Sequence, residues 1–581
     1  MRCKGILRNM GVVFAGYLVL TVVTSLIMRD ISPRHTLFFL VDSLLFVGGT
    51  HLYVDRRRYC LDLSALLLVL CSVFMIRYLT PTNIQLWEVA NYFSFCFAVS
   101  NLVLVVVSLF RRKWLSRSVA MILLGGAFLP VMILWGYYFS EYSWLNVEGV
   151  MAILQTNSSE AWSYVHDRTG IGGYLACLVY IGFVMAGAWQ AKGLRLRQGK
   201  AAVWIGVAFF VVLNIVLLRR TSDNFVMSIY EESKVYTARY TEFKNAKERR
   251  EAGLGTGLDI EKADEKGIYV LVIGESQNRK HMSAYGYDKE TTPWLTSMKD
   301  DSRFLLFDQA YSCHVQTVPV LSYALTAKNQ YNDMELEQAV SIVDMAKAAG
   351  YETVWLSNQV HYGAWDTPIS VIGETADYHE WINSHVGQTL DTDYYDGELL
   401  EHLKDIPKSD KMLIVLHLMG NHISYHSRYP ETFNQFHGNG KISEYDNSIL
   451  YNDHVMKELL SQVTAMPDFK GLIYFADHSE AVDEHMSHNP GTFVFDMADI
   501  PLYMYFSDAY IQEHRDRFEQ LKEERQSCFT DDLIFNALMG IMGIREPQLY
   551  EPQNDLTSKA YDRELSRFVT LYGKRHISED Q

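Results

Sequence analysis

Two carboxylates, a hydroxyl and an imidazole stand close to points where the sequence predicts that buried strands end. Glu275 follows the apolar run IYVLVIG, and Asp477 and His478 follow a second run, GLIYFA. Thr317 lies between them along the chain. Open α/β sheets bind ligands at the carboxyl ends of their strands, and carboxylate and imidazole groups are ligands of zinc. We therefore expect a zinc site that contains a hydroxyl nucleophile.

Thr317 is the candidate nucleophile, although a threonine hydroxyl reacts poorly at neutral pH. Such a group needs an adjacent base, a lowered pKa or a metal. Zinc lowers the pKa of bound water from about 15.7 to about 7, and a coordinated alcohol gains from the same effect. The alternatives are that Thr317 is a buried loop residue without chemistry and that Glu275 only caps the following helix.

The sequence around these groups resembles the membrane-bound phosphoethanolamine transferases of the alkaline-phosphatase superfamily. The stretch GESQNRKHMSAYGYDKETTPWL follows the family pattern GE-S/T-x-x-R…YGY…TTP, and the candidate nucleophile follows Cys313 by four residues, as in the family. The resemblance implies that Thr317 accepts the transferred group. It implies that zinc is held by Glu275, Thr317, Asp477 and His478. It implies structural roles for Arg279, Tyr285 and Tyr287.

Three further residues have family counterparts near the transferred phosphate, namely His422, His488 and Glu480. The resemblance implies that they hold this phosphate or bind a second zinc ion. His485 competes with His488, because the spacing from Asp477 is shorter here than in the best-known members. Some members carry a lysine that is absent from this chain, and His361 is the candidate to replace it.

The chain departs from the family pattern at two positions near the site. The family writes DHGE, whereas this chain writes DHSE, with Ser479 in place of the glycine. If the glycine serves close backbone approach, the change alters local geometry without removing a ligand. The family often places a second cysteine about ten residues after the first, closing a small disulfide, and Tyr323 occupies that position here.

Residues 150–165, VMAILQTNSSEAWSYV, resemble the loop that helps the family bind the lipid headgroup. Thr156 and Glu160 match the family, which implies that they contact the substrate, whereas Ala152 replaces a family Asn. The alternative is a short interfacial helix that begins near Thr156 or Asn157.

The elements that position these residues form an α/β pattern in the C-terminal half. Short apolar runs at 268–274, 304–311, 351–358, 411–420, 471–477 and 500–506 alternate with helical periodicity, for example at 336–350 and 442–463. This alternation predicts a doubly wound, mostly parallel sheet, which is the fold class expected of an alkaline-phosphatase-like domain over residues 267–581. The polar segment 221–266 is expected to connect this domain to the preceding half along the membrane surface.

Residues 1–220 are predicted to form a transmembrane domain. Apolar blocks at 11–28, 36–54, 60–77, 88–110, 119–140, 172–192 and 201–218 are long enough to cross a bilayer. Alternate loops carry the basic residues Arg2, Lys4, Arg8, Arg56, Arg57, Arg58, Arg111, Arg112, Lys113, Arg117, Lys192, Arg195, Arg197 and Lys200. The positive-inside rule places these loops and the N-terminus in the cytoplasm. An odd number of spans then exports the C-terminal domain, so we expect an inner-membrane protein with a periplasmic catalytic domain.

The composition of the chain limits both the classes of partner it can bind and the disulfides it can form. The 581-residue chain has a net charge of −16, which argues against nucleic acid, because that ligand needs clustered Lys and Arg. The exported half contains two cysteines, Cys313 and Cys528, which allow at most one internal disulfide. The sequence leaves their pairing open.

The resulting expectation is a zinc-dependent transfer of phosphoethanolamine from phosphatidylethanolamine to Thr317 and then to an envelope glycolipid or glycan. The acceptor is lipid A, a core heptose or another glycan, and one zinc ion or two are compatible with the residues. One alternative is a phosphoglycerol transferase of the lipoteichoic-acid-synthase type. Another is a membrane-anchored binding protein that has lost catalysis.

Overall fold

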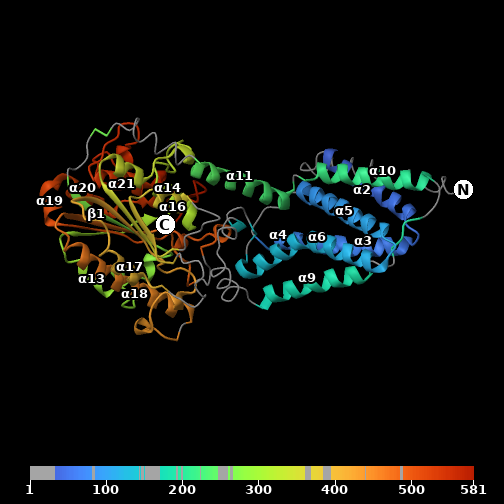
Figure 1. The fold of residues 1–581 in the computed structure, drawn as a ribbon, viewed down its shortest axis with the longest axis horizontal. Coiled ribbons are helices and arrows are strands. Elements are labelled where there is room, and N and C mark those ends of the chain that lie inside the picture. The colour runs from blue at the N-terminus through green and yellow to red at the C-terminus, as the bar shows by residue number, and fades with distance from the viewer. Residues whose placement is uncertain are drawn as a thin grey trace. The chain divides into compact units, whose positions relative to one another are not determined.

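The structure of this chain is a computed structural model. It describes residues 33–80, 86–142, 144–145, 149–150, 171–190, 194–197, 201–222, 224–245, 260–261, 266–359, 368–383, 394–438, 440–483 and 488–580. The backbone divides into an N-terminal unit that extends to Lys234 and a C-terminal unit that continues from Val235. Figure 1 labels most of the helices of both units and strand β1.

The N-terminal unit is helical throughout its described residues, apart from short connections. Its helices are α2 (Pro33–Leu52), α3 (Arg56–Leu70), α4 (Val73–Leu79), α5 (Leu86–Leu109), α6 (Lys113–Glu141), α9 (Ile171–Gln190) and α10 (Ala201–Arg220). Helix α5 packs against α2, α3, α6 and α10, and α6 packs along α9. Many large apolar side chains face outward, including Ile171 and Leu178 of α9. Such a surface suits a lipid environment.

Five helical stretches of the described chain are long and apolar enough to cross a membrane. They are Arg56–Leu79, Glu88–Leu109, Lys113–Ser140, Ile171–Gln190 and Val203–Arg220. The block predicted at 36–54 corresponds to α2, whose apolar part, Leu37–Leu52, is shorter. The block predicted at 11–28 lies outside the described residues. Helix α11 (Phe225–Asn245) occupies much of the predicted connecting segment.

The C-terminal unit contains a seven-stranded sheet in the order β2-β8-β7-β1-β6-β4-β5. The strands are β1 (Gly267–Gly274), β2 (Phe304–Phe307), β4 (Glu352–Ser357), β5 (Tyr378–Trp381), β6 (Lys411–His417), β7 (Phe469–Ala476) and β8 (Leu502–Phe506). All neighbours from β7 to β5 are parallel, and β8 runs antiparallel to both β7 and β2. The predicted mostly parallel α/β sheet is confirmed.

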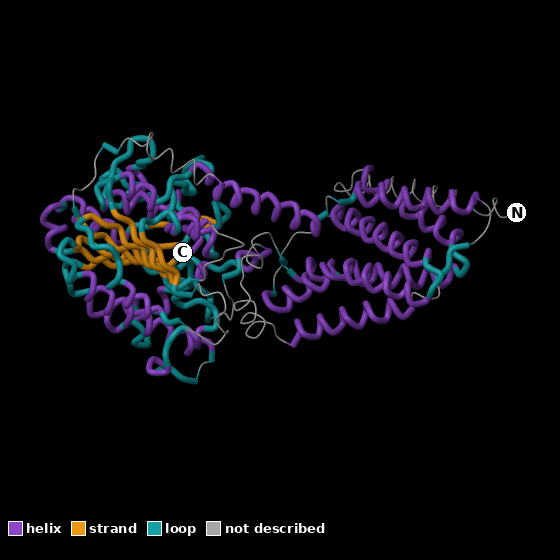
Figure 2. The backbone as a smooth tube through the Cα atoms, viewed as in Figure 1, coloured by secondary structure: helices purple, strands orange, loops and turns teal. Residues whose placement is uncertain are grey.

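Helices cover both faces of this sheet (Figures 1 and 2). Side chains of β1 enter the cores on both faces. Tyr269, Leu271 and Ile273 pack on one face, with α14 (Thr317–Ala324), α15 (Ile342–Ala348) and α21 (Ile534–Ile541). Val270 and Val272 pack on the other face, with α18 (Lys441–Val463). A strand buried on both faces reads as a continuous apolar run rather than an alternating one, which is the pattern of IYVLVIG.

Two of the predicted elements differ in extent from those observed. The run 304–311 splits into β2 and the two-residue strand β3 (Ala310–Tyr311), which pairs with β9 (Phe529–Thr530) in a separate sheet. The helix predicted over 336–350 begins only at Ile342. Ser341 and Asp344 form a capping box that fixes this start. Helix α18 spans the whole predicted range of 442–463 and begins one residue earlier.

Candidate metal and nucleophile site

The parallel pairing of β1 with β7 brings the site together. Gly274 pairs with Ala476 at the last position of the ladder, so Glu275 and Asp477 leave the sheet side by side. The N–H of Asp477 donates to the carbonyl of Gly274 at 3.0 Å. The two carboxylates are thus neighbours because two buried parallel strands end in register.

The chain after β1 turns through a strained residue. Ser276 has φ 54°, a left-handed conformation that is unusual for a residue with a side chain. Its N–H donates to Oδ1 of Asp477 at 3.1 Å, and its carbonyl accepts from the buried Tyr445 hydroxyl at 2.7 Å. The same hydroxyl accepts from the N–H of Asn278 at 2.8 Å. These contacts hold the turn and aim Glu275 across the sheet edge.

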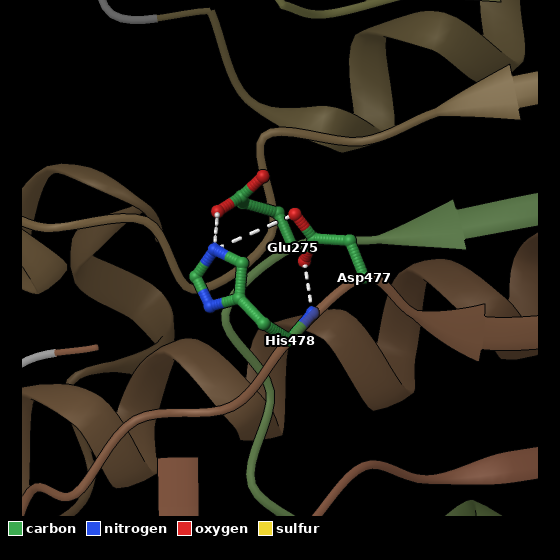
Figure 3. Close-up of side chains that lie close together, drawn as sticks. All are labelled: Glu275, Asp477 and His478. Atoms are coloured by element: carbon green, nitrogen blue, oxygen red, sulfur yellow. Dashed lines mark hydrogen bonds and ion pairs between the residues drawn. The ribbon is translucent and has the colours of Figure 1, made fainter. Parts of the chain in front are cut away.

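Glu275, Asp477 and His478 form a compact cluster that is closed to solvent (Figure 3). One ligand atom from each lies within 4.8 Å of the others. His478 Nε2 is 3.3 Å from Glu275 Oε1 and 3.5 Å from Asp477 Oδ2. Thr317, the first residue of α14, places Oγ1 3.2 Å from Glu275 Oε2 and 3.4 Å from His478 Nε2. The structure therefore brings together all four residues predicted to form the zinc site.

The backbone after Asp477 orients the imidazole. His478 Nδ1 lies 3.1 Å from the Ser479 carbonyl, an acceptor that assigns the proton to Nδ1 and leaves Nε2 facing the carboxylates. Ser479 is buried, its N–H donates to the Met497 carbonyl at 3.0 Å, and its φ is not positive. Serine thus fits the family's glycine position without left-handed strain.

The electrostatics of the cluster favour a cation. Burial and the nearby Glu275 charge raise the pKa of Asp477 well above its usual range. Burial alone would raise the pKa of Glu275, but the hydrogen bond and charge of His478 hold it below its ordinary value. Burial opposes a charged His478, yet Asp477 and Glu275 raise its pKa to about 10. Without a metal, the charged imidazole would neutralise one of the two carboxylates.

The donor set fits zinc. Asp477 Oδ2 is buried and accepts no hydrogen bond from any described residue. Two carboxylate oxygens, one imidazole nitrogen and one hydroxyl oxygen supply the four hard or borderline donors that a tetrahedral zinc site uses. A divalent cation would also neutralise the two buried carboxylates that are otherwise costly to desolvate.

His488 and Glu480 lie beside this cluster. His488 Nδ1 is 2.8 Å from Oε1 of the buried Glu480, and the rings of His488 and His478 have centroids 4.3 Å apart. The carboxylate orients His488 and leaves its Nε2 available to a ligand. His485 and His361, the competing residues, lie outside the described chain, as do Thr156 and Glu160.

His422 is brought to the site by a turn after β6. Gly420 has φ +49°, and a Cβ there would lie 2.8 Å from the N and O atoms of Glu275, so this close approach requires glycine. The N–H of Asn421 donates to the Glu275 carbonyl at 2.9 Å. The charge of His422 contributes to lowering the pKa of Glu275, which places its imidazole in electrostatic reach of the cluster.

Sequence reasoning missed two residues that contact these elements. Asp396 accepts hydrogen bonds from the N–H groups of Met419 and Gly420, both at 2.8 Å, and so holds the turn that precedes His422. His314 is buried three residues before Thr317, and burial lowers its pKa to about 3. Its place in SCHVQT, beside the candidate nucleophile, was the available sequence signal.

The remaining motif residues make structural contacts. Arg279 Nη2 pairs with Asp499 Oδ1 at 2.7 Å, and the Tyr285 hydroxyl bonds the Leu502 backbone. Tyr287 donates to Asp446 at 3.3 Å. Cys313 and Cys528 are both free and buried.

Comparison with known proteins identifies the C-terminal half. Residues 268–544 match the sulfatase family. They form a sulfatase-family domain. The chain is 31% identical over 331 residues to phosphoethanolamine transferase EptC of Escherichia coli O18:K1:H7, covering 53% of this chain and 56% of that protein. The chain thus spans about half the length of the curated relatives it matches.

Solved structures extend the likeness of the sulfatase-family domain. The zinc complex of the C-terminal periplasmic domain of E. coli EptC has a TM-score of 0.50 and 28% identity, covering 55% of this chain and 93% of that one. The integral membrane protein lipooligosaccharide phosphoethanolamine transferase A of Neisseria meningitidis has a TM-score of 0.58 at 18% identity, covering 86% of this chain and 97% of that one. The second likeness concerns the fold alone.

Proposed function

We propose that this protein is a membrane-bound, zinc-dependent phosphoethanolamine transferase. The observation that carries the proposal is the position of Thr317, whose hydroxyl lies 3.2 Å from Glu275 and 3.4 Å from His478 at the edge of a buried carboxylate–imidazole cluster. The names of its relatives and the zinc complex of one of them support the same reaction class.

The reaction has two displacements at phosphorus. Thr317 Oγ1 attacks the phosphate of phosphatidylethanolamine, the bond from phosphorus to the glycerol oxygen breaks, and diacylglycerol leaves with a proton. A hydroxyl of an envelope glycolipid or glycan then attacks the phosphothreonine, and Thr317 recovers its proton. Zinc held by Glu275, Thr317, Asp477 and His478 would lower the pKa of the attacking hydroxyl and stabilise charge on the phosphoryl oxygens.

His422, His488 and Glu480 are assigned to the phosphate or to a second zinc ion. Glu480 fixes the Nδ1 side of His488 at 2.8 Å, so the opposite nitrogen is presented to a ligand. His422 follows a turn packed directly on the Glu275 backbone. Both imidazoles are thus carried by segments anchored to the cluster.

The helices and the basic loops support the membrane arrangement that we propose. We assign residues 1–220 to the inner membrane with a cytoplasmic N-terminus, residues 221–266 to a connecting segment, and residues 267–581 to the periplasm. The observed boundary between the two units, at Lys234 and Val235, falls inside that connecting segment. Thr156 and Glu160 are assigned to the phosphoethanolamine headgroup, in the exported loop 150–165.

Mass spectrometry of the enzyme intermediate tests this function. The full-length protein, purified in detergent and mixed with vesicles of phosphatidylethanolamine, should gain one phosphoethanolamine group on the peptide that contains Thr317. Thr317→Ala should gain none and remain folded, because only a hydroxyl and a methyl group at a helix start are removed. A matched incubation with phosphatidylglycerol separates the alternatives, since a phosphoglycerol adduct there would replace the proposed donor. Absence of any adduct with either lipid would contradict the proposal.

A further inference from the structure

The segment that carries the nucleophile is held by a short hairpin much later in the chain. Strands β10 (Val569–Thr570) and β11 (Arg575–His576) pair antiparallel and are joined by a four-residue turn. The Thr570 hydroxyl donates to the Ser312 carbonyl at 2.7 Å. The hairpin thus touches the chain just ahead of Thr317.

Tyr572, in the turn of this hairpin, contacts the nucleophile segment on both sides of Thr317. Before the threonine, its N–H donates to the Cys313 carbonyl at 3.3 Å and its ring lies 4.9 Å from the His314 ring. After the threonine, its hydroxyl donates to the Pro319 carbonyl at 2.8 Å and its ring stacks on Tyr323 at 4.6 Å. One side chain therefore bridges both flanks of Thr317.

The backbone of this turn adopts left-handed conformations that direct the Tyr572 ring towards the nucleophile segment. Leu571 and Tyr572 have φ 52° and 56°, and Gly573 has φ 85°, giving three successive left-handed residues. Left-handed residues with side chains cost free energy and persist where the surroundings fix them. The contacts of Tyr572 with residues 313–323 are such surroundings.

In the part of the chain that the structure describes, no disulfide restrains this segment. Cys313 is free, and Tyr323 stands where the resemblance placed a second cysteine. Tyr323 instead stacks on Tyr572. The start of the segment is also fixed by Asp531, which accepts from the Cys313 N–H at 2.8 Å, whereas the Tyr572 contacts extend into α14.

We propose that Tyr572 is a positioning residue for Thr317, replacing a disulfide by an aromatic stack and a hydrogen bond. This inference rests on the proposed transfer reaction for its kinetic consequence. Its structural consequence, restraint of residues 312–324, is independent of the reaction. A nucleophile displaced by about 1 Å can lose on the order of a hundredfold in rate, so loosening α14 should slow phosphothreonine formation more than it weakens lipid binding.

The test compares two substitutions at Tyr572 with two at a control position. Tyr572→Ala removes the stack and the hydrogen bond, and Tyr572→Phe removes only the bond to Pro319. Tyr550→Ala and Tyr550→Phe serve as controls, because the Tyr550 hydroxyl bonds Asp555 at 2.9 Å in the same C-terminal region. Each full-length variant is measured for kcat and KM of transfer from phosphatidylethanolamine vesicles, zinc content, thermal unfolding and amide hydrogen exchange.

We expect Tyr572→Ala to lower kcat about tenfold or more, with KM changed less than about twofold, full zinc content and faster exchange over residues 312–324. Tyr572→Phe should retain the stack and recover part of kcat. The Tyr550 variants should keep kcat and the exchange of 312–324 even where their melting temperatures fall.

Unchanged kcat and unchanged exchange in Tyr572→Ala would overturn the positioning role, as would an equal loss of kcat in Tyr550→Ala. An inactive wild type with faster exchange in Tyr572→Ala would instead reject the transfer reaction and retain the restraint. The two failures are therefore distinguishable.

Discussion

Glu275, Asp477 and His478 concentrate two carboxylates and one imidazole in a volume that water does not reach. Their pKa values shift in opposed directions: burial and the Glu275 charge make Asp477 harder to ionise, whereas His478 keeps the pKa of Glu275 low, and both carboxylates favour a charged imidazole. A bound divalent ion would neutralise both carboxylates, whereas the imidazole proton neutralises only one. The cluster therefore favours a bound cation.

Metal retention tests these three ligands. Glu275→Gln, Asp477→Asn and His478→Ala should each weaken zinc binding by about tenfold or more, since even outer-shell partners of a metal typically contribute that much. Zinc per protein, measured by elemental mass spectrometry after dialysis, gives the result. His437→Ala, at an exposed position, is the control. Full zinc content in all three variants would remove the metal from this cluster.

The identities of the four central residues could be predicted because each lies in a local motif at a strand or helix terminus. The supporting residues could not. Tyr445 donates a hydrogen bond to the Ser276 carbonyl across 169 positions of sequence. Asp396 accepts hydrogen bonds from backbone N–H groups of the turn before His422, and a backbone contact of this kind leaves no side-chain pattern in the sequence. Neither residue differs in type from an ordinary core or surface residue, so its role becomes visible only when the partners are in place.

At the scale of elements, the buried strands were recognisable because each is a short, almost entirely apolar run. Their order in the sheet could not be recognised from the sequence. Strand β1 lies between β7 and β6, which come some 140 to 200 positions later, and apolar runs carry little information about which of them will be neighbours. The antiparallel edge formed by β8 and β2 likewise depends on tertiary pairing rather than on local pattern.

The junction of α13 (Pro293–Met298) with α18 should make stability depend on pH. Asp453 of α18 accepts from the N–H groups of Trp294 and Leu295 at 2.8 and 3.0 Å. Burial raises its pKa from 3.8 to about 7, although these hydrogen bonds oppose the shift. The folded protein therefore holds this proton more tightly than the unfolded chain, and the free energy of unfolding falls as pH rises from 3.8 towards 7.

Thermal unfolding of the detergent-solubilised protein at pH 5 and pH 8 measures this effect. Each unit of pH within the window corresponds to at most about 1.4 kcal/mol from this group. Asp453→Asn keeps an acceptor oxygen but cannot titrate, so its melting temperature should fall less between pH 5 and pH 8 than that of the wild type. Equal falls in both proteins would show that Asp453 is not the source.

At the scale of the molecule, the membrane half is expected to hold the lipid near the nucleophile. The detached domain 221–581 has its own two-sided core and should fold. It should transfer poorly from bilayer phosphatidylethanolamine, because lost proximity can withdraw roughly 7–11 kcal/mol of barrier lowering. A small soluble phosphoethanolamine ester should still react slowly. Equal rates for the detached and full-length proteins on vesicles would remove Thr156 and Glu160 from the headgroup site.

The hairpin at 569–576 is also synthesised long after the nucleophile segment that it contacts. The bond from Thr570 to Ser312 joins positions 258 apart, and ribosomes add about 5–20 residues per second. Thr317 is therefore synthesised roughly 10–50 seconds before the hairpin that contacts its segment. Until the hairpin is synthesised, the segment of Thr317 lacks the contacts of Thr570 and Tyr572, so we expect phosphothreonine to form more slowly on such a nascent chain.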